Sequence, residues 1–155
     1  MGTAINYTRN IVQTVVFFFL STAITWYFIE CGSSLYHFDE HKMQLSCAIA
    51  GGKWAIQIIA AVLFLDDKRW IFIRNIAFTC FIGSWILVPF CIAPIRVILP
   101  GNGFLISLIA SVAVMLVLYY NSVRGSGVSI KWYFLWLACL VTAISLQLTV
   151  VFHVV

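Results

Sequence analysis

Charged side chains are scarce in this sequence. Of its 155 residues, 9% are Asp, Glu, Lys or Arg and 63% are hydrophobic, and the mean hydropathy is +1.05. Soluble chains carry about 25% charged residues, so these few charges could not cover a surface that faces water. The composition is typical of a polytopic protein of the cell (inner or plasma) membrane, with the lipid bilayer as its solvent. In a bilayer the backbone must be helical or form a closed barrel.

Motifs that would identify an enzyme or a metal protein are also missing. The sequence has five cysteines but no CxxC pair, which excludes a thioredoxin-like motif and a zinc ribbon. It has no glycine-rich phosphate loop, no HExxH, no GxSxG and no EF-hand loop. The net charge of +4 comes from nine Lys and Arg residues spread along the chain rather than gathered in one patch. We therefore expect no nucleic-acid partner.

Apolar segments make up most of the chain. A membrane-spanning helix needs about 20 mostly apolar residues, and five segments meet or nearly meet this length. They cover approximately residues 11–30, 47–65, 70–95, 103–120 and 131–155. Because the segments are continuously apolar, they exclude a barrel, whose strands alternate. The predicted fold is all-α: one domain of residues 1–155, a bundle of five transmembrane helices, with a loop from Glu30 to Ser46.

The cations predict how the bundle is oriented. Cytoplasmic loops carry an excess of Lys and Arg. With the N-terminus inside and the C-terminus outside, five cations near the segment ends lie on the cytoplasmic side and two on the outer side. The five are Arg9, Lys68, Arg69, Arg124 and Lys131, and the two are Lys42 and Arg96.

Small hydroxyl residues follow one face of two segments. The first segment aligns Thr14, Ser21 and Thr25, and the fifth aligns Thr142, Ser145, Thr149 and His153 at helical spacing. Such residues mark the packed faces of membrane helices. They could serve interhelical packing alone or line a substrate or ion pathway. Both interpretations turn the two stripes toward the bundle interior.

All three histidines fall on the predicted outer side. His37 and His41 lie in the first outer loop beside Asp39 and Glu40, and His153 ends the fifth segment. Imidazole and carboxylate together suit zinc or copper, and histidine pairs also hold haem iron, so a metal or haem is a candidate cofactor. The alternative is a solvated loop that collects polar residues because the bilayer excludes them.

Two cysteines, Cys31 and Cys47, flank this predicted outer loop. In an oxidising compartment they could close it with a disulfide, provided that their Cα atoms come within about 7 Å. The alternative is that both are thiols packed as small apolar groups.

Lys53 is the most costly residue in the chain. It lies two turns inside the second segment, where a charge costs a few kcal/mol and is a functional candidate by default. Gln57 shares its helix face, and Glu30, Asp39 and Glu40 are its candidate partners. We expect the ammonium to point into the bundle or up toward Glu30. Either it snorkels to the interface, or it is an inward cation that binds an anionic headgroup, binds a carboxylate substrate or serves as a proton-linked switch.

Two classes of function follow. The first is a transporter or channel component, or an accessory subunit of a membrane complex, since the chain has almost no soluble loops and its polar stripes are expected to face inward. The alternative is a membrane-embedded redox or metal-dependent enzyme with its site at the extracytoplasmic interface. Because five helices make a thin bundle around a pathway, we expect a homo-oligomer or a partner membrane subunit.

Overall fold

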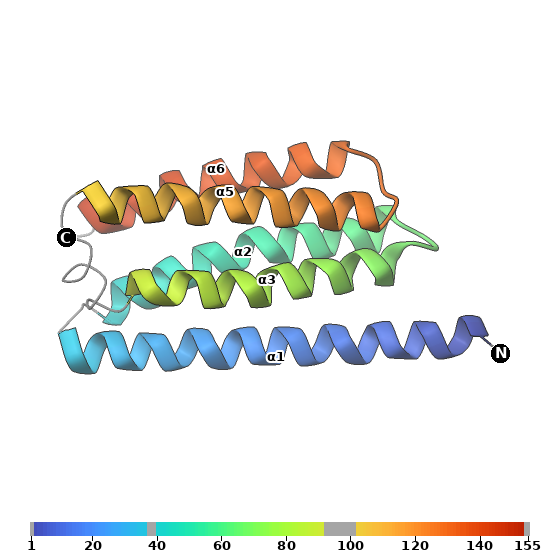
Figure 1. The fold of residues 1–155 in the computed structure, drawn as a ribbon, viewed down its shortest axis with the longest axis horizontal. Coiled ribbons are helices and arrows are strands. Elements are labelled where there is room, and N and C mark those ends of the chain that lie inside the picture. The colour runs from blue at the N-terminus through green and yellow to red at the C-terminus, as the bar shows by residue number, and fades with distance from the viewer. Residues whose placement is uncertain (1, 37–39, 92–101, 154–155) are drawn as a thin grey trace.

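The computed structural model describes residues 2–36, 40–91 and 102–153, and within these ranges the chain is helical with no strand, which confirms the all-α class. Figure 1 shows five long helices. They are α1 (Gly2–Tyr36), α2 (Glu40–Phe64), α3 (Arg69–Cys91), α5 (Asn102–Gly125) and α6 (Lys131–His153).

The five helices lie side by side along one long axis, and each runs antiparallel to the one before it (Figure 1). Most of the contacts of α1 are with α3, while α2 packs mainly against α6, and α3 also packs against α5. Among the described helices, α1 begins and α6 ends at opposite ends of the bundle (Figure 1).

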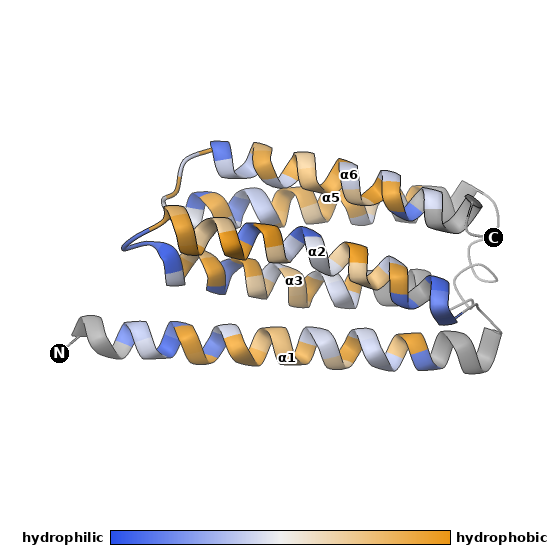
Figure 2. Cartoon of the chain, turned by 180° about the vertical axis from the view of Figure 1, so that it is seen from behind, coloured by the Kyte–Doolittle hydropathy of each residue, from blue (hydrophilic) through white to orange (hydrophobic). Residues whose placement is uncertain are grey.

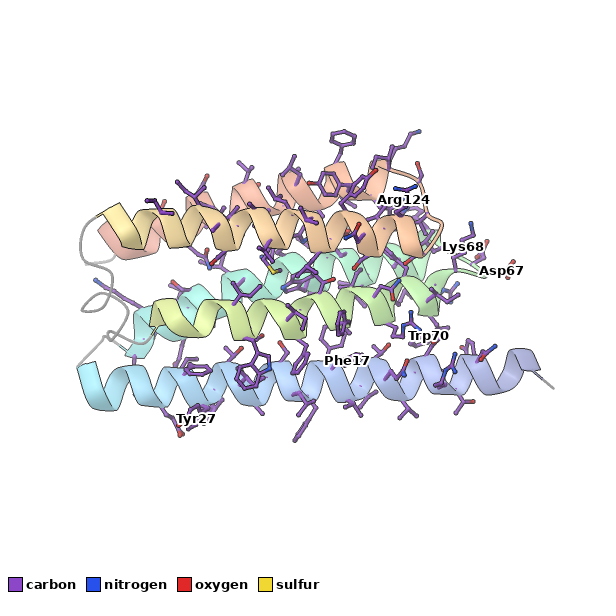
Figure 3. All side chains as sticks on the ribbon, viewed as in Figure 1. Phe17, Tyr27, Asp67, Lys68, Trp70 and Arg124 are labelled. Carbon is purple, nitrogen blue, oxygen red and sulfur yellow. The ribbon has the colours of Figure 1, made fainter. Side chains whose placement is uncertain are left out.

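One end of the bundle gathers most of the cations. The start of α1, the α2–α3 turn and the α5–α6 turn all lie there (Figure 1). Figure 3 shows Lys68 and Arg124 at this end, which we call the cationic end, and Tyr27 toward the other. The two turns are joined, since Lys68 Nζ donates a hydrogen bond of 2.5 Å to the carbonyl oxygen of Gly127. Gly127 has a φ of 63°, a left-handed conformation that glycine adopts without steric cost.

Several predicted boundaries differ clearly from the structure, and the first helix begins at Gly2 rather than near residue 11. The segment Glu30 to Ser46, expected to be a loop, is helical up to Tyr36 and again from Glu40. The fourth helix ends at Gly125 rather than near residue 120. Polar residues are compatible with helix ends, and Glu40 in the first turn of α2 complements the helix dipole. Its side chain also accepts a hydrogen bond of 2.9 Å from Gln44. The end of an apolar run is therefore not the end of the helix.

The core of the bundle is aromatic. Trp54 of α2, Tyr119 of α5 and Trp136 of α6 are buried together. The rings of Tyr119 and Trp136 stack with centroids 4.2 Å apart and planes 9° apart, and Trp54 lies 5.9 Å from Trp136. We call these three rings the aromatic layer. It joins the middle of α2 to the last turns of α5 and the first turns of α6. Figure 2 shows mainly hydrophobic residues along the helices, with hydrophilic colours near the helix ends and also in the middle of α2.

Two helices have the length and hydropathy needed to cross a membrane. In the described part of the chain these are Asn6–Glu30 within α1 and Glu40–Phe64, each with a mean hydropathy of 1.7. Of their apolar 18-residue windows, 11% and 17% of the residues are buried inside the bundle. Shorter apolar stretches lie in α5 and α6, at Ile109–Gly125 and Lys131–Gln147.

Candidate functional site

A cavity of about 460 Å³ lies between α1, α2 and α3, in the part of the bundle away from the cationic end. Phe18, Ser21 and Trp26 of α1 line one wall, and Lys53 and Trp54 of α2 line another. Among its described lining residues, Lys53 is the single charged one. The volume is within the range of about 300–1,000 Å³ found for small-molecule sites.

Lys53 points into the bundle, as the sequence predicts, but it is not paired with Glu30. Its Nζ lies 5.1 Å from the ring centroid of Trp54 and 5.9 Å from that of Trp136, both within the range of a cation–π interaction. The carboxylate of Glu30 accepts a hydrogen bond of 2.7 Å from Trp26 Nε1 instead. In the described ranges no carboxylate lies within salt-bridge distance of the ammonium.

Gln57 lies one turn below Lys53 and is fully buried. Its Oε1 accepts a hydrogen bond of 2.9 Å from the hydroxyl of Tyr119, and its Nε2 lies 3.9 Å from the sulfur of Cys139. The amide therefore ties α2 to α5 and α6 beneath the cavity. Beside it, the indole Nε1 of Trp136 is buried with no hydrogen-bond partner among the described residues.

The hydroxyls of the cavity wall are already bonded within the protein. Ser21 and Ser84 share a hydrogen bond of 2.6 Å between α1 and α3, and Ser21 also lies 3.2 Å from the sulfur of Cys80. Thr25 donates to the backbone carbonyl of Ser21 over 2.8 Å. The stripe of Thr14, Ser21 and Thr25 thus faces the bundle as predicted, with Thr14 and Ser21 buried.

The matching stripe on α6 does not face inward, so that expectation is wrong for the single chain. Thr142, Ser145 and Thr149 are all exposed. Their hydroxyls donate to the carbonyls four residues earlier, at 2.9, 3.0 and 3.0 Å. A hydroxyl bonded to its own helix needs no partner on a neighbouring helix, so spacing alone did not determine the direction of the stripe.

The predicted outer metal or haem site falls largely outside the described residues. His37 and Asp39 are not among them, and neither is the side chain of His153. His41 and Glu40 are exposed at the start of α2. The described residues contain no group of three His, Cys, Asp or Glu side chains that could hold a metal ion. The disulfide between Cys31 and Cys47 stays a prediction, because the side chain of Cys31 is not described.

Sequence reasoning missed a polar network near the cationic end. The guanidinium of Arg74 donates to the side-chain oxygens of Asn75, at 2.7 and 3.2 Å, and of Asn10, at 3.2 Å. Asn75 in turn donates to the hydroxyl of Ser126 over 2.7 Å. These bonds join α1, α3 and the end of α5. Asn75, next to Arg74 in the sequence, was the available signal, whereas the contact between Arg74 and Asn10 depends on the packing of α1 against α3.

The network extends further into the bundle. The hydroxyls of Thr79 and Ser122 share a hydrogen bond of 2.7 Å between α3 and α5, and Asn10, Thr79 and Ser126 are all buried.

The chain matches no protein-family model, no curated protein and no solved structure. The function is therefore inferred from the cavity and the surface alone.

Proposed function

We propose that the chain is a five-span integral membrane protein. The observation that carries this proposal is the exposure of large apolar side chains on every helix. One from each helix is Phe19 (71% exposed), Leu63 (68%), Trp85 (53%), Ile106 (66%) and Phe134 (61%). Soluble proteins rarely expose apolar patches beyond a few hundred Å², whereas in a bilayer the same side chains contact lipid.

The helix lengths support five spans. The helices contain 35, 25, 23, 24 and 23 residues, and about 20 residues suffice to cross the hydrocarbon core. The charge distribution supports the orientation, since the cationic end carries both described inter-helix turns, with Lys68 and Lys131. That end is cytoplasmic by the positive-inside rule, which leaves the cavity in the outer half of the bundle.

Within the membrane, the chain acts as a component of a transporter or as an accessory subunit of a membrane complex. Its site is the cavity between α1, α2 and α3, where an apolar wall surrounds one cation, Lys53. The exposed hydroxyl stripe of α6 offers polar contacts for a second copy or a partner subunit. The alternative of a redox or metal-dependent enzyme depends on His37, Asp39 and His153, whose side chains the structure does not describe.

Extraction and labelling test the proposal. Alkaline carbonate washing should leave the full chain in the membrane pellet. In a variant whose native cysteines are replaced by serine, a membrane-impermeant maleimide should label Gln44→Cys on intact cells and Ser129→Cys only after permeabilisation. Both positions are exposed, at opposite ends of the bundle. Release by carbonate would contradict membrane insertion, and equal labelling of the two variants would contradict an odd number of crossings between them.

A further inference from the structure

The cavity combines an apolar wall with one positive charge, Lys53, which has no ionic partner among the described residues. Resting on the membrane location proposed above, we propose that it binds an amphiphile with an apolar chain and one anionic head, carboxylate or phosphate, with the head at Lys53. Three features of the structure carry this inference: the contacts of the Lys53 ammonium, the apolar wall of the cavity and the position of its mouth.

Among the described residues, no group accepts a hydrogen bond from the ammonium of Lys53. Its described contacts are the faces of two indoles, Trp54 and Trp136, at 5.1 and 5.9 Å. A ring face attracts the charge but replaces none of its three hydrogen bonds. Among the described residues no carboxylate reaches it. An anionic oxygen beside Nζ would supply a charge-assisted hydrogen bond, which is stronger than one between neutral groups.

The rest of the cavity favours an apolar chain over a small polar anion. The hydroxyls of Ser21, Thr25 and Ser84 are each bonded to another protein group. The remaining wall is largely apolar, formed by side chains such as Phe18, Ile58 and Met115. A hydrated ion would lose water at this wall without gaining hydrogen bonds, whereas an alkyl chain gains from contact with it.

The mouth of the cavity opens sideways between α1 and α2. Thr22 and Trp26 of α1 and Gly51 and Ala55 of α2 line the cavity and are exposed. A side chain at Gly51 would meet nothing within 4 Å, so this part of the mouth is open. In a membrane, this opening faces the outer leaflet, from which an amphiphile enters without crossing water.

Quenching of tryptophan fluorescence by brominated amphiphiles tests the proposal, because Trp26 and Trp54 line the cavity. The full chain in neutral maltoside micelles is titrated with dibrominated stearate, its methyl ester and a dibrominated phosphatidate. We expect quenching by stearate, by phosphatidate or by both, and the pattern distinguishes a fatty acid from a lipid headgroup. The methyl ester should require at least a tenfold higher concentration, and inorganic phosphate should not reverse the quenching.

Substitutions of Lys53 test whether its positive charge binds the anionic head. Lys53→Met should raise the concentration of anion needed for half-quenching at least tenfold and leave the methyl ester unaffected. Lys53→Arg should keep anion binding, and the matched control Lys131→Met, on the exposed start of α6, should behave as the unmodified chain. Unchanged anion binding in Lys53→Met would overturn the proposal. Equal quenching of the unmodified chain by the methyl ester and by the anion would also overturn the proposal. This comparison uses the unmodified chain alone, so it does not depend on whether a variant folds. Carbonate extraction and labelling are separate readouts, so a membrane protein that binds no anion would refute this inference alone.

Discussion

The cationic end and the cavity hold a positive charge inside the bundle in two different ways. Arg74 donates three hydrogen bonds to the side-chain oxygens of Asn10 and Asn75. Lys53 has two ring faces beside it and a cavity in front of it. In the parts of the chain that the structure describes, neither cation has a carboxylate within salt-bridge distance.

The difference separates a structural cation from a binding cation. A guanidinium whose donors are satisfied by amides on two helices holds those helices together, and removing one amide leaves charge and donors without partners. An ammonium that is only solvated by aromatic faces contributes little to stability. It lies where an added anion would gain most. Three substitutions test this contrast.

The largest loss of stability should come from Asn75→Ala. This change removes the acceptor of two hydrogen bonds from Arg74 and the donor to Ser126. We expect the free energy of unfolding to fall by about 2–3 kcal/mol, which is the range for losing hydrogen bonds to a charged group. Thermal unfolding in detergent measures the effect, and Asn121→Ala, at an exposed site on α5, is the matched control. Equal losses in the two variants would show that the network is not structural.

A smaller loss is expected for Tyr119→Phe. The hydroxyl of Tyr119 is the donor to the fully buried Gln57, and an unsatisfied buried acceptor costs about 1–2 kcal/mol. The exposed neighbour offers the control Tyr120→Phe, which should be neutral. Adding Gln57→Leu to Tyr119→Phe should recover part of the loss, because replacing both partners removes the unsatisfied group. A double variant less stable than Tyr119→Phe alone would contradict this assignment.

The smallest effect on stability is expected for Lys53→Met. The change loses a cation–π contribution of about 0.5–1 kcal/mol, but it also removes a charge that is costly in hydrocarbon. The two terms oppose each other, so the melting temperature should stay close to that of the unmodified chain. A destabilisation as large as that of Asn75→Ala would mean that Lys53 is a structural cation too.

The sequence predicted the all-α class from composition and from continuous apolar runs, and each predicted segment overlaps one described helix, although α1 extends beyond its segment at both ends. It failed from Glu30 to Ser46, because helices here continue past the apolar residues into polar ones. Hydropathy marks where apolar residues stop. Backbone hydrogen bonding and capping decide where the helix itself stops.

The candidate site was predicted in part. The charge of Lys53 and its shared face with Gln57 could be read from spacing, but its aromatic surroundings could not. Tyr119 and Trp136 lie more than sixty residues beyond Lys53 in the chain, and only packing brings them to α2. The outward direction of Thr142 and Ser145 was likewise unpredictable, since a hydroxyl bonded to its own helix is compatible with either face.

The most direct test of the contrast between the structural cation Arg74 and the binding cation Lys53 is stabilisation by a ligand. It is measured by thermal unfolding of the chain with and without oleate in neutral detergent. A ligand at 100 times its Kd stabilises by about 2.7 kcal/mol. We predict this gain for the unmodified chain and for Asn75→Ala. For Lys53→Met, whose anion binding should be at least tenfold weaker, the gain should fall to about 1.4 kcal/mol or less. Methyl oleate should stabilise the unmodified chain and Asn75→Ala much less than oleate does. A gain in Lys53→Met equal to that of the unmodified chain would contradict the assignment of Lys53 as the binding cation.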